Sequence, residues 1–222
     1  MKHRRLIVAT LTATAALAVV VGKFAVAEPN KDAKPAAAAA AAQPAMKLPP
    51  GWTEQDMQKC MAATVPGKMH EQLLRGVGAS QGKQTMWMYP GADPVVCDVT
   101  ANVTAIMDGR YVKTEITGDV PGMGPFTGSG INGFDNVSQQ FVATWIDNWT
   151  TGILTATGKQ SADGNTMTWN YTFNCPLTSK PQMIRQIETF SGADKWTLES
   201  HTTDPKSGKE YKMMTLEFTK KS

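Results

Sequence analysis

Residues 141–158, FVATWIDNWTTGILTATG, contain the pattern that decides the fold. Trp145, Asp147 and Trp149 stand at every second position, and side chains at that spacing point to one face of an extended chain. Thr151-Gly152 then gives a turn signal before a second alternating segment. Two tryptophans with a carboxylate between them are too apolar for a solvent-facing surface and too polar for a plain core. We therefore predict a strand, a turn and a second strand, with both indoles turned inward.

The alternation begins near Ser80 and continues to the C-terminus. Segments of about 8–12 residues, rich in Val, Ile, Thr, Trp and Tyr, alternate with turn signals such as Pro90-Gly91 and Asp108-Gly109. Evenly spaced strands without intervening helices predict an antiparallel meander. Because closing such a sheet removes both exposed edges, we predict an all-β fold. It is an antiparallel up-and-down barrel of about ten strands over residues 80–222, with a two-sheet sandwich as the alternative.

Glycines within one strand support closure of the sheet. Gly128 and Gly130 share a strand face, and Gly133 lies near the end of the same segment. Interior glycines weaken a flat strand, but they permit sharp coiling and close approach by side chains from the opposite side.

One or two short helices are predicted before the barrel, in residues 51–79. Thr53 is followed three positions later by Asp56, which is the spacing of a capping box at a helix start. Pro66-Gly67 ends this helix, and a second short one follows until Gly76 and Gly78.

The first 27 residues have the pattern of a secretory signal peptide. A basic start, MKHRR, precedes an apolar stretch from Leu6 to Gly22, and small residues stand at Ala25 and Ala27. We expect cleavage after Ala27, export to the periplasm or the exterior, and no stable membrane span afterwards. Residues 28–50 read as a low-complexity linker of Ala, Pro and Lys that cannot offset its ordering entropy.

The charge balance excludes two classes of partner. Removing residues 1–27 takes away four of the 22 basic residues and none of the 19 acidic ones, which leaves a net charge of −1. No basic patch remains to attract a nucleic acid or an anionic membrane. The oligomeric state stays open.

Four blocks in fixed order carry a resemblance to a known family: MWMYPGADP, TGDVPGMGPFTGSGINGFDN, FVATWIDNWTTGI and DPKSGKEYKMMTLEFTKK. From roughly Pro66 to Lys221 the chain resembles the bacterial family called domain of unknown function 1579, which is grouped with the calycins, the lipocalin-like β-barrels. The resemblance implies a barrel with an internal cavity, and it implies no activity.

The chain departs from that family at the start of its first strand. Gly78-Ala79-Ser80 stands where family members similar to it have Gly-x-Trp, whose tryptophan closes the barrel floor in lipocalins. The chain end, Lys220-Lys221, also lacks the arginine that could stack on that ring. We therefore expect the floor to be closed differently, by Leu73, Leu74 and Val77.

Three interpretations of the Trp145, Asp147 and Trp149 face remain open. The indoles can fill the core while the carboxylate reaches a turn amide or an arginine. They can line a ligand cavity in which Asp147 fixes a polar group. Asp147 can also act as a buried general base.

Three further residues are candidates for ligand binding. Glu115 alternates with large neighbours, and Arg185 lies between apolar residues, where it could bind an internal carboxylate or a fatty-acid-like head group. Outward snorkelling of the arginine is the alternative. Met88 belongs to a large set of methionines, which are deformable fillers in cavities that accept varied apolar molecules.

Cysteine and histidine limit the chemistry. Cys60, Cys97 and Cys175 allow at most one internal disulfide, and we expect Cys97–Cys175 because the meander places both at one mouth of the barrel. The cysteine spacings match no metal site. Only His70 and His201 remain after signal removal, and no G-x-S-x-G nucleophile motif occurs. We predict no metal and no cofactor.

Three classes of function follow. The first is an exported protein that binds a small apolar or amphipathic molecule inside the barrel. The second is an enzyme that acts on such a molecule through a buried carboxylate. The third is a non-catalytic envelope or interaction module with a packed barrel. Because the sequence has no catalytic motif, we favour binding over catalysis.

Overall fold

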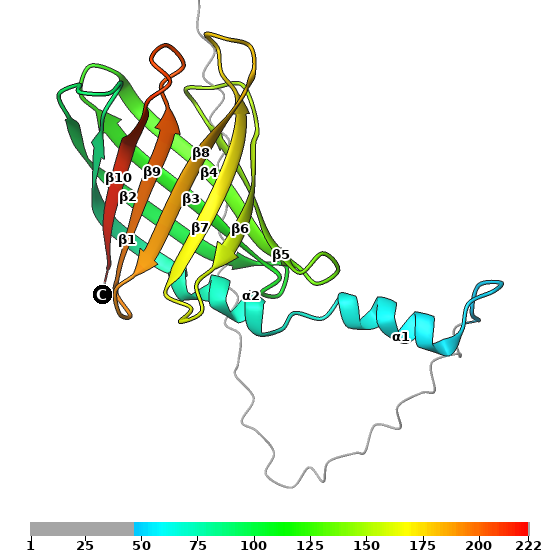
Figure 1. The fold of residues 1–222 in the computed structure, drawn as a ribbon. Coiled ribbons are helices and arrows are strands. Elements are labelled where there is room, and N and C mark those ends of the chain that lie inside the picture. Colours follow the sequence, from blue (N-terminus) through cyan, green and yellow to red (C-terminus); the bar gives the residue numbers. More distant parts are fainter. Residues whose placement is uncertain (1–46, 222) are drawn as a thin grey trace, which may run out of the picture. The chain divides into compact units, whose positions relative to one another are not determined.

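The computed structural model describes residues 47–221. Ten antiparallel strands form a closed barrel in which each strand pairs with its neighbours in sequence and β1 pairs with β10 (Figure 1). The predicted barrel is confirmed. The strands are β1 (Gly78–Met86), β2 (Val95–Ile106), β3 (Tyr111–Val120), β4 (Gly124–Asp135), β5 (Gln140–Asp147), β6 (Leu154–Gln160), β7 (Thr166–Asn174), β8 (Pro181–Phe190), β9 (Lys195–Thr203) and β10 (Glu210–Lys220).

The expected signal peptide, residues 1–27, lies outside the described residues, as does the expected linker up to residue 46.

Strand residues alternate between the barrel interior and its outer surface. In β2, Cys97, Val99 and Ala101 are buried, whereas Asp98 and Thr100 between them are exposed. The same two-residue period runs through β5, where Phe141 and Ala143 are buried. Antiparallel pairing keeps the inward residues of neighbouring strands side by side, so these rows make one continuous inner surface.

Two helices and a 3-10 turn precede the barrel: α1 (Glu54–Ala63), α2 (Lys68–Leu73) and η1 (Leu74–Gly76). The predicted capping box starts α1: the Asp56 amide donates to Thr53 Oγ1 at 3.2 Å, and the Thr53 amide donates to Asp56 Oδ2 at 2.9 Å. No residue of α1 is buried. Its C-terminal end is held by Asn136, whose side-chain amide donates to the Ala63 carbonyl at 3.1 Å.

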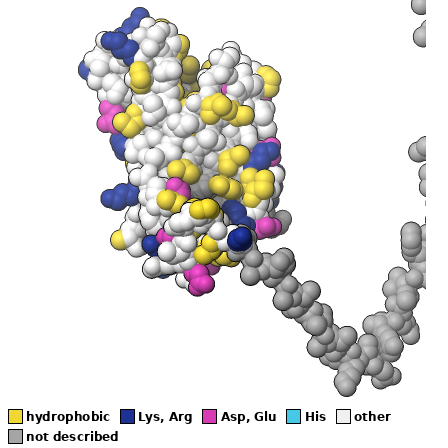
Figure 2. Space-filling view, turned by 90° about the vertical axis from the view of Figure 1, so that its right-hand side faces the viewer, with side chains coloured by type: hydrophobic (Ala, Val, Ile, Leu, Met, Phe, Trp, Pro, Cys, Tyr) yellow, Lys and Arg dark blue, Asp and Glu magenta, His cyan; other side chains and the backbone are white. Residues whose placement is uncertain are grey.

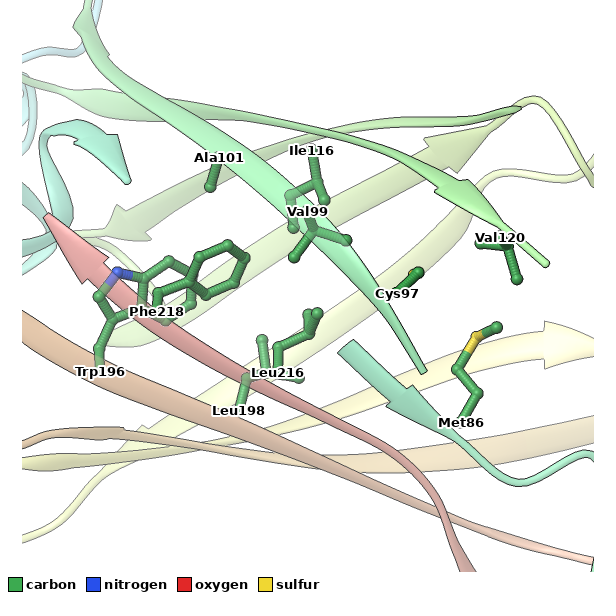
Figure 3. Close-up of a cluster of buried hydrophobic side chains, with 10 residues drawn as sticks. All are labelled: Met86, Cys97, Val99, Ala101, Ile116, Val120, Trp196, Leu198, Leu216 and Phe218. Atoms are coloured by element: carbon green, nitrogen blue, oxygen red, sulfur yellow. The ribbon is translucent and has the colours of Figure 1, made fainter. Parts of the chain in front are cut away.

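Two clusters of buried side chains lie on opposite sides of the barrel. One gathers residues from β1 to β3 with β9 and β10 (Figure 3), and there the Trp196 and Phe218 rings stack with centroids 4.2 Å apart. The other centres on Phe141 and Trp169 and receives Met69 and Leu73 from α2. Trp145 packs against both clusters and therefore joins them.

Large rings of the interior rest against glycines of the adjacent strand. A Cβ at Gly158 would lie 2.6 Å from two ring atoms of Trp169, and a Cβ at Gly130 would lie 2.9 Å from the Trp145 ring. Phe218 occupies the equivalent place beside Gly82. Each glycine lets a ring approach the backbone of the wall; the sequence predicted this close approach for Gly130 but not for Gly158 or Gly82.

The expected Cys97–Cys175 disulfide is not formed, since Cys60, Cys97 and Cys175 are all free thiols. β2 and β7 lie on opposite sides of the ring of strands. The loop after β7 forms a local turn, in which the Ser179 amide donates to the Cys175 carbonyl at 2.7 Å. The position of the two strands in the ring therefore accounts for the absence of this bond among residues 47–221.

Substitution of Gly158 by Ala tests the contact between ring and glycine. We expect Gly158→Ala to lower the free energy of unfolding by about 1–3 kcal/mol, because Trp169 and Phe141 must both move to admit the methyl group. Gly152→Ala is the control, since nothing lies within 4 Å of a Cβ at that exposed position. Chemical denaturation of both variants measures the effect, and equal stability of the two would contradict it.

Candidate ligand-binding lumen

The barrel encloses a cavity of about 270 Å³. This volume is close to the lower end of the range for small-molecule pockets. Side chains of α2, η1 and the strands line it, and seven of the lining residues are aromatic: Phe126, Trp145, Trp149, Trp169, Tyr171, Phe190 and Trp196. The inward faces of the strands therefore leave room for a molecule, and the barrel is not packed solid.

The segment α2–η1 lies at one end of the cavity, and Arg75 fastens it there. Arg75 Nη1 donates to the Gly164 carbonyl at 2.6 Å, and Nη2 donates to Asn165 Oδ1 at 3.2 Å. Its guanidinium lies 4.8 Å from the ring centroid of Phe190. Of the three residues expected to close the floor, Leu73 lines the cavity, whereas Leu74 and Val77 are half-buried outside the lining.

The other end of the barrel carries the connections β1–β2, β3–β4, β5–β6, β7–β8 and β9–β10. Figure 2 shows that the upper rim, on the side that faces the viewer, is divided by a notch into two lobes. Asp147 and Trp149, where β5 ends, line the cavity, as do Met213 and Met214 of β10. We therefore regard this rim as the entrance to the lumen.

Trp145, Asp147 and Trp149 all line the cavity, so the predicted inward face exists. The Asp147 carboxylate accepts three hydrogen bonds, from Trp145 Nε1 at 3.1 Å, from the Trp149 amide at 3.0 Å and from the Thr150 amide at 2.9 Å. Asp147 thus orients one indole and caps the turn after β5. This use of the carboxylate matches the interpretation in which it reaches a turn amide.

Two substitutions separate these duties of Asp147. We expect Asp147→Ala to lower the free energy of unfolding by about 1–3 kcal/mol, because three N–H donors lose their acceptor. Asp147→Asn should cost less, since its carbonyl oxygen can still accept from the turn amides while its NH₂ group cannot accept from Trp145. Denaturation curves of both variants check the order. Asp119→Ala, at an exposed position without a side-chain hydrogen bond in residues 47–221, is the control.

Glu115, Arg185 and Met88 lie outside the cavity lining. On the outer surface, Glu115 Oε1 forms an ion pair with Lys113 Nζ at 2.7 Å. Arg185 Nη2 forms an ion pair with Glu210 Oε1, also at 2.7 Å. Met88 is 54% exposed in the loop after β1. The strand alternation turns both charged side chains outward, because Thr114 and Ile116 beside Glu115, and Ile184 and Gln186 beside Arg185, take the inward positions of the same strands.

Glu188 is the acidic lumen residue that sequence reasoning missed. The inner row of β8 is Ile184, Gln186, Glu188 and Phe190, all of which line the cavity. Trp169 Nε1 donates to Glu188 Oε2 over a long 3.4 Å. Burial raises the pKa of the Glu188 carboxyl, and the indole hydrogen bond offsets this only in part. Burial, reinforced by the Glu188 charge, also raises the pKa of the neighbouring Tyr171 hydroxyl.

The β8 sequence MIRQIETF carries apolar residues on both faces. Alternation alone therefore does not show which face points inward, and the prediction that Arg185 faces the lumen is wrong. The available signal lies on the partner strand. Trp169 and Tyr171 of β7 are buried, and they pair with Gln186 and Ile184. If the pairing of β8 with β7 is assigned so that the residues opposite these two aromatic side chains point inward, Glu188 also falls on the inner face.

The pH dependence of stability tests the burial of Glu188. Because the folded pKa lies above the ordinary value of 4.5, the folded protein binds this proton more tightly than the unfolded chain. Wild-type stability should therefore lose a contribution as the pH rises from about 4.5 towards the raised pKa, and level off above it. Because glutamine does not titrate, the stability of Glu188→Gln does not change with the ionisation of this side chain. We expect its melting temperature, relative to wild type, to increase over this interval.

Thermal denaturation of both proteins at a series of pH values measures the difference. Parallel curves for wild type and Glu188→Gln would show that the carboxyl is not desolvated. Glu115→Gln, on the outer surface, is the matched control and should leave the wild-type profile unchanged in shape.

Neutral polar groups also face the lumen without a protein partner. Within residues 47–221, no side-chain hydrogen bond is made by six lining residues: Gln84, Thr114, Asn132, Thr166, Gln186 and Ser200. The indole N–H of Trp196 is buried and likewise lacks an acceptor in this part of the chain. Polar groups in a mostly apolar cavity fix the orientation of a bound molecule or of water.

The described residues 47–221 contain no cluster of three or more His, Cys, Asp or Glu side chains placed to hold a metal ion. None of their helices has both the length and the apolar character to cross a membrane.

Comparisons with known proteins agree with this architecture. The model of the family described as "Protein of unknown function (DUF1579)" matches residues 65–220, which confirms the resemblance seen in the sequence. The crystal structure of Rv2717c from M. tuberculosis is similar with a TM-score of 0.52 and 10% identity, over 71% of this chain and 100% of that one. Comparison with curated proteins gives no match.

A second solved structure is that of the S-type phycobiliprotein lyase CPES from Guillardia theta. It has a TM-score of 0.50 and 12% identity, over 70% of this chain and 94% of that one. At such identities the likeness shows a shared fold.

Proposed function

This chain belongs to the DUF1579 family, and from its barrel we propose that it binds a small apolar or amphipathic molecule in the lumen. We also propose that it does so after export to the periplasm or the exterior. The cavity of about 270 Å³ carries the first proposal. The walls of a cavity of this size have no protein atoms packed against them on the lumen side, and a bound molecule supplies those contacts.

The character of the lining supports a ligand with a large apolar part. Aromatic and aliphatic side chains cover most of the wall, and a few unpartnered polar groups interrupt it. This combination is typical of small-molecule sites, in which apolar contact supplies affinity and polar groups supply orientation. The likeness in fold to a phycobiliprotein lyase is consistent with a small-molecule partner, although the small lumen favours a compact ligand.

The geometry gives less support to catalysis through Asp147. All three of its hydrogen bonds come from the neighbouring turn and from Trp145, so its oxygens are engaged in holding local structure. The support for export comes from the sequence of residues 1–27, which has the basic, apolar and small-residue segments of a signal peptide.

Titration with 1-octanol tests lumen binding through the fluorescence of the tryptophans that line it. Thr114 faces the cavity, so Thr114→Phe should fill part of it and weaken octanol binding by about tenfold or more. Thr104→Phe is the matched control, because Thr104 is exposed on the neighbouring strand β2. It should bind octanol like wild type.

Native mass spectrometry of the protein purified from its own host supplies a second test. We expect a copurifying small molecule that is lost in Thr114→Phe. Absence of octanol binding by the wild type, or equal binding by the two phenylalanine variants, would contradict the proposal.

A further inference from the structure

Three charged side chains line the lumen: Arg75, Asp147 and Glu188. Arg75 donates to the Gly164 carbonyl and to Asn165 and lies over Phe190, so its charge is engaged at the floor. Asp147 accepts from three N–H groups. Glu188 differs from both, since the single 3.4 Å contact from Trp169 is its only hydrogen bond within residues 47–221.

The surroundings of Glu188 offer no charge partner. Across the sheet it lies between Leu198 of β9 and Met167 of β7, both buried. Among the described residues, no Lys, Arg or His comes within ion-pair distance of its carboxylate. Glu188 is half-buried and its side chain lines the lumen. A carboxylate that is partly removed from water without a cation is costly, and the cost falls when a positive group is brought to it.

The rings near Glu188 add to this preference. Trp169 donates its N–H to the carboxylate, and Tyr171 lines the same part of the wall. Aromatic faces attract a cation through their quadrupole, most strongly where water is excluded. A carboxylate among indole and phenol rings is therefore a site for a positive group.

Resting on the proposed lumen-binding function, we propose that the ligand is an amphiphile with a protonated amine, which pairs with Glu188 while its apolar part fills the aromatic cavity. A fatty acid is the opposite case. Its carboxylate would meet the Glu188 carboxylate at this part of the wall, and like charges at short range repel.

Three probes with the same alkyl chain and different head groups test the proposal: octylamine, 1-octanol and octanoate. Wild-type protein should bind octylamine about tenfold tighter than octanol, the effect of one added charged hydrogen bond, and octanoate most weakly. In Glu188→Gln the preference for the amine should shrink to within about twofold. Glu115→Gln removes an acidic side chain from the outer surface and should keep the wild-type order.

The outcomes separate this proposal from the general one. If octanol binds but octylamine binds no better, or if Glu188→Gln keeps the full amine preference, the amine proposal is overturned and lumen binding stands. If wild type binds none of the three probes, the lumen proposal itself fails. Should Glu188→Gln not fold, the order of the three probes on wild type still decides.

Discussion

Pairing of the first strand with the last determines everything else in this molecule. β1 and β10 are matched from Ser80 with Lys220 to Met86 with Met214, and this pairing joins the two edges that an open sheet would leave free. A ring of ten strands also fixes which side chains point inward, because a slip of one residue in any pair would exchange the two faces of that strand. The cavity and the residues on its wall follow from that closure.

The space inside the barrel persists because its largest rings lie close to the wall. Trp145 rests against Gly128 and Gly130, Trp169 against Gly158, and Phe218 against Gly82. Without a Cβ on those strands, each ring takes up volume beside the backbone and less at the axis. Asp147 holds the Trp145 ring in that position through the indole N–H. The glycines and the aromatic residues therefore act together to keep a lumen open.

Sequence patterns predicted those parts of the structure that depend on near neighbours. Strict alternation in residues 141–149 assigned Trp145, Asp147 and Trp149 to the inner face, and the spacing of Thr53 and Asp56 located the start of α1. Both signals are complete within a few residues, so no distant contact is needed to interpret them.

The errors concern relations between distant strands. Arg185 and Glu188 lie on opposite faces of a strand whose two faces look alike in the sequence, and only its register with β7 distinguishes them. The Cys97–Cys175 prediction relied on the two cysteines sharing one mouth of the barrel, but the circumference of the ring separates them. Placement around the ring depends on the whole set of pairings, which no single segment encodes.

The backbone holds the wall of the barrel, whereas the lumen side chains determine what the interior can bind, and this separation has an evolutionary consequence. The wall is held by hydrogen bonds between strands, whereas Glu188 and the polar groups near it support almost none of the protein's own structure. Selection can therefore change the chemistry of the interior one residue at a time while the scaffold stays intact. Descendants of one ancestral barrel could diverge in what they carry long before their architecture shows any difference.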